Sequence, residues 1–481
     1  MNNMKRIFGL LLLSILLCDC QNQRDITHSY IGGEIINPTD KKITIFKSNV
    51  IIDTLFLDSN NRFITKIEST VPGFYGFSHG NEYQLILLEP KDSITLRVNT
   101  LDFDESLSFS GLGSKKNNYL INLFTKYENS RRNSSNLYKL NPTSFKNKLD
   151  SIKLNEIKLL KSFTSSTPIS TLFKGIAINT IDYIFNSKKE AYRFIELNNS
   201  DDVLYPNDFY DFRKNINYNN TLLQDFYHYY NFLFPHFDNL AYEEFIKTNN
   251  KKLFKKDNTK YNLIKLNLID SLVTNQEIKS RLTSFITRRF LSFSKTQGEA
   301  NKIYNHYLNI NKTTNDSSKN YQKKRITTLF NSLKKLKKGK KLPIIELINS
   351  NKIPVNINNL INDKSLIYFW SQNSKNSFKY SHNKVKELKN KYPNINFISI
   401  NIDNISNDKW LNKLKINSSY CNCSECKSKT PINEFKLRNA EIAKRLLGIQ
   451  YIRKTIIVDS KMNIIESNVN LFSDNLDNII N

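Results

Sequence analysis

Glycine, proline and cysteine are scarce in this sequence of 481 residues, with 12, 11 and 5 copies respectively. The shortage of glycine and proline argues against long flexible linkers between domains. The mean hydropathy of −0.49 excludes a protein that crosses a membrane many times. At this length two or three domains are expected, because a single core does not grow to such a size.

Nucleic-acid-binding motifs are also missing, although the chain is basic. Lysine and arginine together number 71 against 44 acidic residues, which gives a formal charge of +27. Charge of this size occurs in proteins that bind nucleic acid. Here the excess lies in lysine, beside abundant asparagine, isoleucine, phenylalanine and tyrosine, as an AT-rich coding bias produces. Because no zinc-finger, helix-turn-helix or RNA-recognition pattern accompanies the charge, we expect no nucleic-acid partner.

The first twenty residues have the layout of an export signal. Lys5 and Arg6 form a short positive region, and an apolar core follows from Ile7 to Leu17. This core is too short for a spanning helix, which needs about 20 residues. Residues 1–20 are therefore predicted to be a signal segment.

Cysteines directly after the apolar core resemble the end of a bacterial lipoprotein signal, where the thiol becomes acylated. Cys18 is our first candidate and Cys20 the second, since neither Leu17 nor Asp19 is the small residue usual before the acylated cysteine. An ordinary secretory signal or an uncleaved anchor stays as the alternative. In each case we expect the mature chain outside the cytoplasm, where disulfides are permitted. The lipid would tie it to the cell envelope, with the protein facing the periplasm.

Two regions of different character come next. Over residues 28–112, short runs rich in β-branched and aromatic residues alternate with turn formers, which predicts a small antiparallel β sandwich or barrel. Over residues 114–338 glycine nearly disappears and apolar residues recur at spacings of three and four, which predicts helices. A lysine-rich helix end before Gly339 closes this region.

The helical region contains the aromatic run DFYHYYNFLFPHF at residues 225–237. One hypothesis is that these rings line a groove that captures a peptide or a sugar. The structural alternative is that they form helix core, which is the more frequent role of an aromatic stripe at helical spacing.

Residues 340–481 alternate between strand and helix, which predicts an α/β sheet with parallel pairs. The whole chain is then a multidomain α+β protein. We expect strands or hairpin arms at 342–348, 352–357, 365–370, 396–402, 452–458 and 462–466, and helices at 375–391, 407–415, 433–447 and near 475.

This last region resembles the thioredoxin-fold domain of TlpA/ResA-like periplasmic oxidoreductases. The resemblance rests on GKKLPIIELINSNKIPVNINNL, KSLIYFWSQNSKNS, KYPNINFISINID and LLGIQYIRKTIIVDSKMNII. The overall layout resembles the lipid-anchored members common in Bacteroidetes. In that family two cysteines, separated by two residues, stand at a helix N-terminus that stabilises a thiolate. The first thiolate attacks a disulfide and the second resolves the mixed disulfide.

Aligned on that family, this chain departs from its pattern at five positions. Ser374 and Ser377 stand where the two cysteines would be, and a hydroxyl cannot form a disulfide. Tyr380 replaces an acidic residue, His382 a helix proline and Arg453 the cis-proline. Because a cis bond before a residue other than proline is costly, a trans bond is expected before Arg453. The resemblance therefore implies a degenerate site without catalytic residues, cofactor or metal.

A hydrolase that uses Ser374 as nucleophile was weighed against this interpretation. It would need a base, and His382 lies about two helical turns farther on. No acid that would orient this histidine is evident in the sequence, so the hypothesis is not favoured.

Three further cysteines, Cys421, Cys423 and Cys426, lie in the run YCNCSECKSKTP. They would form a displaced redox dithiol, a metal site completed by His382, or a structural disulfide with one thiol left over. Zinc ligands usually come as two paired sets and no second set is present, so we expect no metal.

The favoured hypothesis is a lipid-anchored binding or scaffold module that meets an envelope protein through a redox-inactive thioredoxin-like surface. The alternative is a thiol-disulfide oxidoreductase or redox sensor that uses Cys421, Cys423 and Cys426.

Overall fold

The computed structural model describes residues 27–480 apart from residues 49, 81, 133, 197–203, 295, 313–316, 373, 375–376, 420–432 and 474. The chain forms two compact units, Met1–Asn239 and Leu240–Asn481, and each is described here by itself. The division falls within helix α6 (Tyr227–Thr248), so the expected helical region contributes to both units. The expected domain boundaries at residues 112 and 340 stay predictions.

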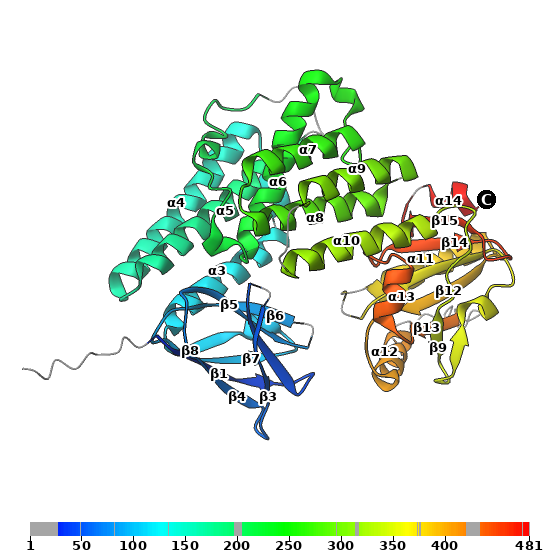
Figure 1. The fold of residues 1–481 in the computed structure, drawn as a ribbon, viewed down its shortest axis with the longest axis horizontal. Helices are drawn as coiled ribbons and strands as arrows, with labels where there is room; N and C mark the ends of the chain where they lie inside the picture. Colours follow the sequence, from blue (N-terminus) through cyan, green and yellow to red (C-terminus); the bar gives the residue numbers. More distant parts are fainter. Residues whose placement is uncertain are drawn as a thin grey trace, which may run out of the picture. The chain divides into compact units, whose positions relative to one another are not determined.

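The first unit begins with two four-stranded sheets (Figure 1). Their orders are β4-β1-β7-β8 and β3-β2-β5-β6. The strands are β1 (Ser29–Ile36), β2 (Lys42–Lys47), β3 (Val50–Phe56), β4 (Arg62–Ile67), β5 (Gly73–His79), β6 (Glu82–Leu88), β7 (Ser93–Asn99) and β8 (Ser108–Leu112). Inward-facing residues of both sheets share one core, as in a β sandwich.

One strand pair corrects the expectation of a purely antiparallel sandwich. β1 and β7 lie side by side and run parallel, with Ile31 opposite Ile94 and Ile35 opposite Val98. The intervening strands β2, β3, β5 and β6 form the second sheet and β4 the edge of the first, so β7 returns to β1 in the same direction. Hydrophobic patterning fixes which face of a strand is buried, but it does not fix the direction of its neighbour.

Helices complete the first unit. They are α2 (Phe103–Ser106), α3 (Ser114–Arg132), α4 (Pro142–Ser166) and α5 (Thr171–Glu196), with short 3-10 turns at Ser134–Lys139, Asp211–Asn215 and Thr221–Leu223. The long helices α4 and α5 pack against each other. Asn141 caps α4 by accepting a hydrogen bond from the Ser144 amide.

Four helices come next after α6 in the second unit, and the last three of them share a core of Leu291, Ala300, Tyr307 and Ile326. They are α7 (Thr259–Leu272), α8 (Gln276–Phe293), α9 (Gln297–Ile310) and α10 (Ser317–Lys335). Side chains of Asn258, Asn275 and Thr296 accept hydrogen bonds at the starts of α7, α8 and α9. Gly339 has φ +78°, which agrees with its expected role after the last helix of the region.

A seven-stranded mixed sheet closes the second unit, in the order β10-β9-β13-β12-β11-β14-β15. β11 is parallel to β12 through helix α11, and β14 and β15 form an antiparallel hairpin on its other side. The strands are β9 (Glu346–Asn349), β10 (Pro354–Asn356), β11 (Ser365–Trp370), β12 (Asn396–Asn401), β13 (Asn433–Leu437), β14 (Lys454–Val458) and β15 (Ile464–Asn470). The helices are α11 (Ser377–Lys391), α12 (Asn407–Ser419), α13 (Ala440–Leu446) and α14 (Leu476–Ile480).

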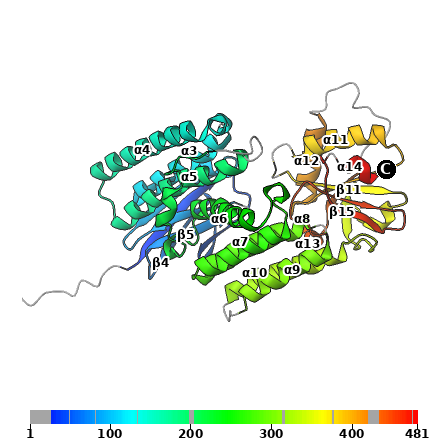
Figure 2. The same cartoon turned by 90° about the horizontal axis from the view of Figure 1, so that it is seen from above.

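Helices cover both faces of this sheet, and Figure 2 shows α11 and α13 on opposite sides of it. Val385 and Leu388 of α11 pack with Leu366 on one face. Ala443 of α13 packs with Ile367 on the other. The expected α/β architecture with parallel pairs is confirmed.

The expected helix over residues 433–447 is wrong. Its first part is strand β13, which lies between β12 and β9, and only Ala440–Leu446 is helical. Phe435 and Leu437 are buried two positions apart in the sheet core, which is strand and not helix spacing. Asn439 then caps the helix by accepting a hydrogen bond from the Ile442 amide.

Candidate functional site

The loop between β11 and α11 is held at its start by a buried carboxylate. Asp403 follows β12 and accepts hydrogen bonds from the Ser371 hydroxyl at 2.5 Å and from the Gln372 amide at 2.7 Å. The amide of Ser374 donates to the Ser371 carbonyl at 3.3 Å, and that of Ser377 to the Ser374 carbonyl at 3.0 Å. Because β11 and β12 are parallel neighbours, their carboxyl ends meet here, and Asp403 fixes the turn that leads into α11.

A cavity of about 810 Å³ opens beside this turn. Four of the five positions singled out in the sequence, Ser374, Ser377, Tyr380 and Arg453, line it, while His382 does not. The other lining residues are Phe293, Tyr368, Phe369, Ser381, Gln450, Tyr451, Ile452, Lys454, Asn468, Val469, Asn470, Leu471 and Phe472. Segments distant in the sequence thus meet at the corner where the family's dithiol would stand.

Aromatic rings dominate the mouth of this cavity. Phe293 at the end of α8 stacks on Tyr451, with ring centres 5.1 Å apart. The Arg453 guanidinium lies over the Phe472 ring at 5.8 Å from its centre. These rings and that of Tyr380 are exposed to solvent. The cavity therefore offers flat apolar surfaces beside one cation, a combination that suits an aromatic or apolar anion.

Arg453 is the residue that the sequence resemblance aligned with a cis-proline. No peptide bond is cis in the described part of the chain, so the expected trans bond before Arg453 is confirmed. Its carbonyl accepts a hydrogen bond from the Leu471 amide at 3.2 Å. Arg453 is thus the last residue of the turn before β14, and it forms part of the cavity wall.

Lys454, the next residue, has a structural role. Its amine donates to the carbonyls of Leu447 and Gly448 at 2.8 and 3.2 Å, at the C-terminal end of α13. These carbonyls have no partner within the helix, so the amine satisfies acceptors that burial would otherwise leave unpaired. Burial lowers the pKa of Lys454 to about 7, against the influence of Glu466.

His382 is buried behind the cavity and does not reach it. Its Nδ1 donates to the Phe378 carbonyl at 2.8 Å, and its Nε2 lies 2.5 Å from Glu434 Oε1. The second Glu434 oxygen accepts a hydrogen bond from the Ser399 hydroxyl at 2.8 Å. Both ring nitrogens are engaged, so this histidine offers no base to Ser374.

The sequence-based expectation that no acid lies beside His382 is also wrong. Glu434 supplies it from β13, a segment that was expected to be helical. Ser399 pairs with Glu434 on one side and with Tyr368 on the other, so the three residues form one row across the sheet under α11. No sequence spacing indicates such a row, because strand order alone creates it.

The aromatic run 225–237 belongs to the core, as its structural interpretation held. Tyr229, Phe232 and Phe237 are fully buried in and around α6. No groove-lining role for them is indicated in the part of the chain that the structure describes.

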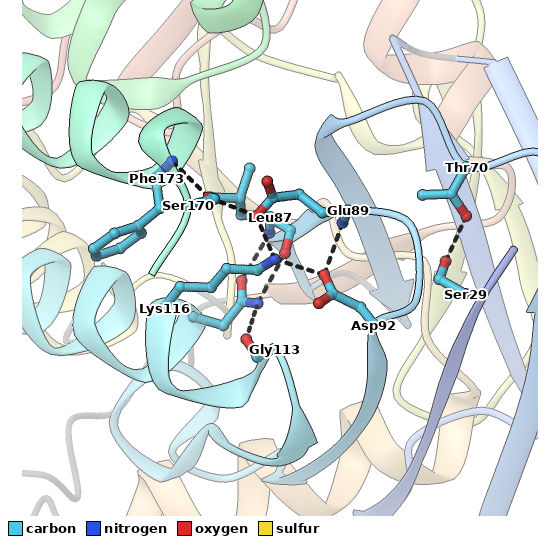
Figure 3. A network of polar contacts seen from close by, with 10 residues as sticks. Ser29, Thr70, Leu87, Glu89, Asp92, Gly113, Lys116, Ser170 and Phe173 are labelled. Atoms are coloured by element: carbon cyan, nitrogen blue, oxygen red, sulfur yellow. Dashed lines mark hydrogen bonds and ion pairs between the residues drawn. The ribbon is translucent and has the colours of Figure 1, made fainter. Parts of the chain in front are cut away.

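Two buried charged clusters lie elsewhere, and both are structural. In Figure 3, Lys116 of α3 donates to Glu89 at 2.7 Å and to Asp92 at 2.6 Å, and the Ser170 hydroxyl donates to the same Glu89 oxygen at 2.9 Å. Burial raises the pKa of Asp92, although Lys116 opposes the effect. The cluster joins the β6–β7 turn to two helices.

The second cluster surrounds Glu190 of α5, which is fully buried. It accepts two hydrogen bonds from Arg213, at 2.8 and 2.6 Å, and it contacts His236 Nδ1 at 2.7 Å and Asn239. Burial alone would raise the pKa of Glu190, but the hydrogen bonds from His236 and Arg213 outweigh it and lower the pKa. The carboxylate of Glu190 is engaged by these side chains, and the contacts with His236 and Asn239 link α5 to α6.

The remaining predicted residues lie outside the described part of the chain. These are Cys18 and Cys20 of the expected lipoprotein signal and Cys421, Cys423 and Cys426. Among the described residues, no cluster of histidine, cysteine, aspartate or glutamate side chains is suited to hold a metal ion. Within the same residues, no helix has the length and apolar character that a membrane crossing requires.

Comparisons with known proteins found partial similarity to solved structures. No family model and no curated protein matches the chain. A thiol-disulfide oxidoreductase from Bacteroides vulgatus is 17% identical and covers 30% of this chain and 96% of its own, with a TM-score of 0.25. The C-terminal domain of another from Bacteroides thetaiotaomicron is 22% identical, covers 30% and 97%, and has a TM-score of 0.24.

A third similar structure is described as the thiol:disulfide interchange protein DsbE from Chlorobium tepidum. It is 15% identical, covers 30% of this chain and 96% of its own, and has a TM-score of 0.24. At such identities and TM-scores, similarity alone assigns no function to this chain.

Proposed function

We propose that this chain is a lipid-anchored protein of the cell envelope whose thioredoxin-like domain has lost its dithiol and binds a ligand instead. The order of the C-terminal sheet supports this domain assignment. It combines a parallel β11–α11–β12 unit with an antiparallel β14–β15 hairpin on the other side of β11. Both predicted features of the family, the second parallel strand and the final hairpin, have counterparts in it.

One observation carries the proposal: Ser374 and Ser377, which the resemblance aligns with the two cysteines of the family, line a cavity. Hydroxyl groups do not exchange disulfides, because the reactive species is a thiolate. The cavity nevertheless persists, with four exposed aromatic rings and Arg453 around it. A site that keeps its shape and replaces its reactive atoms is suited to binding.

The ligand class proposed is an aromatic or apolar group that carries an anionic charge. Phe293 and Tyr451 offer a stacked pair, and the Arg453 guanidinium lies over Phe472 on the same cavity. Such a group could be part of an envelope protein or a small molecule. Stacking and the charge-assisted contact would both favour it.

Dye binding tests this site directly. The unlipidated chain from Gln21 to Asn481 is titrated with anilinonaphthalene sulfonate, an aromatic anion whose fluorescence rises in apolar pockets. Arg453→Gln is expected to weaken binding about tenfold, since it removes one charge-assisted contact. Arg325→Gln is the matched control, because Arg325 also lies over an exposed ring, that of Tyr321, at 5.5 Å. Equal dye affinity in both variants would contradict the proposed site.

Insulin reduction tests the loss of dithiol chemistry. The wild-type chain is expected to show no turnover above that of a variant in which Cys421, Cys423 and Cys426 are all serine. Turnover that disappears in that variant would favour the alternative, an oxidoreductase with displaced thiols. Acylation is tested separately with variants in which Cys18 or Cys20 is replaced by serine. Each variant is expressed in cells and extracted from their membranes, and its mass is measured.

A further inference from the structure

The tip of the β2–β3 hairpin exposes an unusual group of aliphatic side chains. Val50, Ile51 and Ile52 are consecutive and exposed, and Val71 of the β4–β5 turn is exposed as well. Val50, Ile52 and Val71 line the same hollow of about 610 Å³. We call these four residues the hairpin patch. Contiguous exposed aliphatics cost solubility unless something covers them.

The patch also lies on an open sheet edge. β3 is the outermost strand of its sheet, and β2 is its single ladder partner among the residues that the structure describes. Exposed edge strands are usually protected by charges, proline or short length. Here the strand has seven residues, and its first three are aliphatic. A covering surface is therefore needed where this edge begins.

The described chain starts beside the patch. The Thr70 amide donates to the Thr27 carbonyl at 2.7 Å, and the Thr27 hydroxyl donates to the Glu68 carbonyl at 3.4 Å. Val71 is the next residue after Thr70. A chain extends at most about 3.5 Å per residue, so Cys18 and Cys20 lie within about 32 and about 25 Å of Thr27. An acyl group on either cysteine would be tethered close to the hairpin patch.

We propose that the hairpin patch docks on the surface of the lipid bilayer in which the chain is anchored, with its aliphatic side chains entering the acyl boundary. This inference rests on the lipid anchor of the proposed function. Burial of aliphatic side chains would drive the contact.

Charge contributes little at this place. Lys66 lines the hollow but pairs with Glu68 at 2.9 Å, and the Lys47 amine donates to the Val71 carbonyl at 2.6 Å. The net charge of +27 would attract the whole chain to anionic lipid, whether or not the patch contributes. Zwitterionic vesicles therefore isolate the contribution of the patch.

The experiment replaces the acyl anchor with a tether, so that it does not depend on lipidation. The chain from Gln21 to Asn481, with an N-terminal histidine tag, is bound to phosphatidylcholine vesicles that contain a nickel-chelating lipid. Ile51→Trp introduces a reporter into the patch. The two native tryptophans, Trp370 and Trp410, are fully buried in the other unit and give a constant background.

Leu112→Trp is the matched control. Leu112 ends β8, the edge strand at the far side of the first sheet, and like Ile51 it is 65% exposed. On vesicles, emission from the variant at position 51 is expected to shift to shorter wavelength and to be quenched by brominated lipid. Emission from the variant at position 112 is expected to remain unchanged. Without a tether, Ile51→Asp is expected to lower partition into these vesicles about tenfold and Leu112→Asp to leave it unchanged.

Two results would overturn the proposal. One is unchanged emission at position 51 on tethered vesicles. The other is a blue shift without vesicles that grows with protein concentration, because it would assign the patch to contact between two copies of the chain. Circular dichroism of each variant verifies that the fold is intact. Failure of acylation in cells would overturn the lipid anchor but would leave the emission result on tethered vesicles as it is.

Discussion

Lys454 shows how a single residue beside the candidate site contributes to stability. It is buried, and its amine ends helix α13 by donating to two carbonyls. The ordinary pKa of 10.5 applies in the unfolded chain, whereas burial lowers the folded value to about 7. Because the folded chain binds this proton less tightly than the unfolded chain does, protonation of Lys454 below about pH 7 destabilises the folded state. This loss of stability disappears as the pH rises from about 7 toward about 10.

Lys454→Met should remove this pH dependence. Relative to the variant, wild-type protein is expected to gain about 1.4 kcal/mol of stability per pH unit between about pH 7 and about pH 10. Urea unfolding followed by tryptophan fluorescence measures it, because the only two tryptophans lie in the second unit. A constant difference in stability across this range would show that Lys454 titrates normally. The variant also loses the hydrogen bonds to the two carbonyls, which changes its stability by a constant amount and does not alter this dependence on pH.

His382 illustrates the limit of prediction at the same scale. The sequence resemblance singled out His382, but it did not indicate which residue His382 contacts. Glu434 follows 52 positions later and reaches it only because β13 lies next to β12. The signal was a single acidic residue in NEFKL, whose two apolar positions are compatible with both helical and strand patterns.

The turn between β11 and α11 is the element on which the functional hypothesis depends. Its backbone is held by Asp403 and by hydrogen bonds between successive turn residues, none of which involves the side chain of Ser374 or Ser377. The turn therefore does not require sulfur to keep its form. This explains how a dithiol can be lost without loss of the fold.

Cysteines introduced at positions 374 and 377 should therefore form a disulfide. In a background with Cys421, Cys423 and Cys426 changed to serine, Ser374→Cys combined with Ser377→Cys is expected to form a disulfide under oxidised glutathione. Alkylation followed by mass measurement counts the free thiols. The single variant Ser374→Cys is the control and keeps one free thiol. Two free thiols in the oxidised double variant would show that the turn has departed from the family's geometry.

Strands β11 and β12 were predicted from the sequence to within a residue or two, since β11 is an almost continuous apolar run and β12 carries phenylalanine and two isoleucines between polar turns. β13 was not, because five residues with two apolar positions do not outweigh the helical pattern after them. Its identity as a strand depends on hydrogen bonds to β12 and β9, which are distant in sequence.

At the scale of the whole molecule, each unit has its own core and its own buried polar cluster. Glu190, with Arg213, His236 and Asn239, belongs to the first unit. Glu434 and Ser399, together with His382 of α11, form the cluster of the second unit. Since both tryptophans are in the second unit, fluorescence reports on that unit, whereas far-ultraviolet circular dichroism reports on the helices and strands of both units.

Glu190→Gln should therefore affect one unit. The change removes the buried negative charge that accepts two hydrogen bonds from Arg213, at an expected cost of about 3–5 kcal/mol. The part of the circular dichroism transition that comes from the first unit is expected to move to lower urea concentration, while the transition seen by tryptophan fluorescence stays. Asp182→Asn, on the same helix, is the control, because its pair with Lys153 is partly exposed and contributes at most about 1 kcal/mol. Coincident shifts of both transitions would show that the units unfold together.

The sequence by itself determined the α/β character of the last third, the helical middle and the presence of Ser374 and Ser377 at the turn into α11, because these follow from local patterns and residue identity. Tertiary structure decided which distant groups meet: Phe293 and Tyr451 with Arg453 at one cavity, Glu434 with His382, and Thr27 with the turn that carries Val71. The physical reason is that residue spacing specifies a strand or helix and its buried face, whereas strand order and chain direction are set by burial of the whole core.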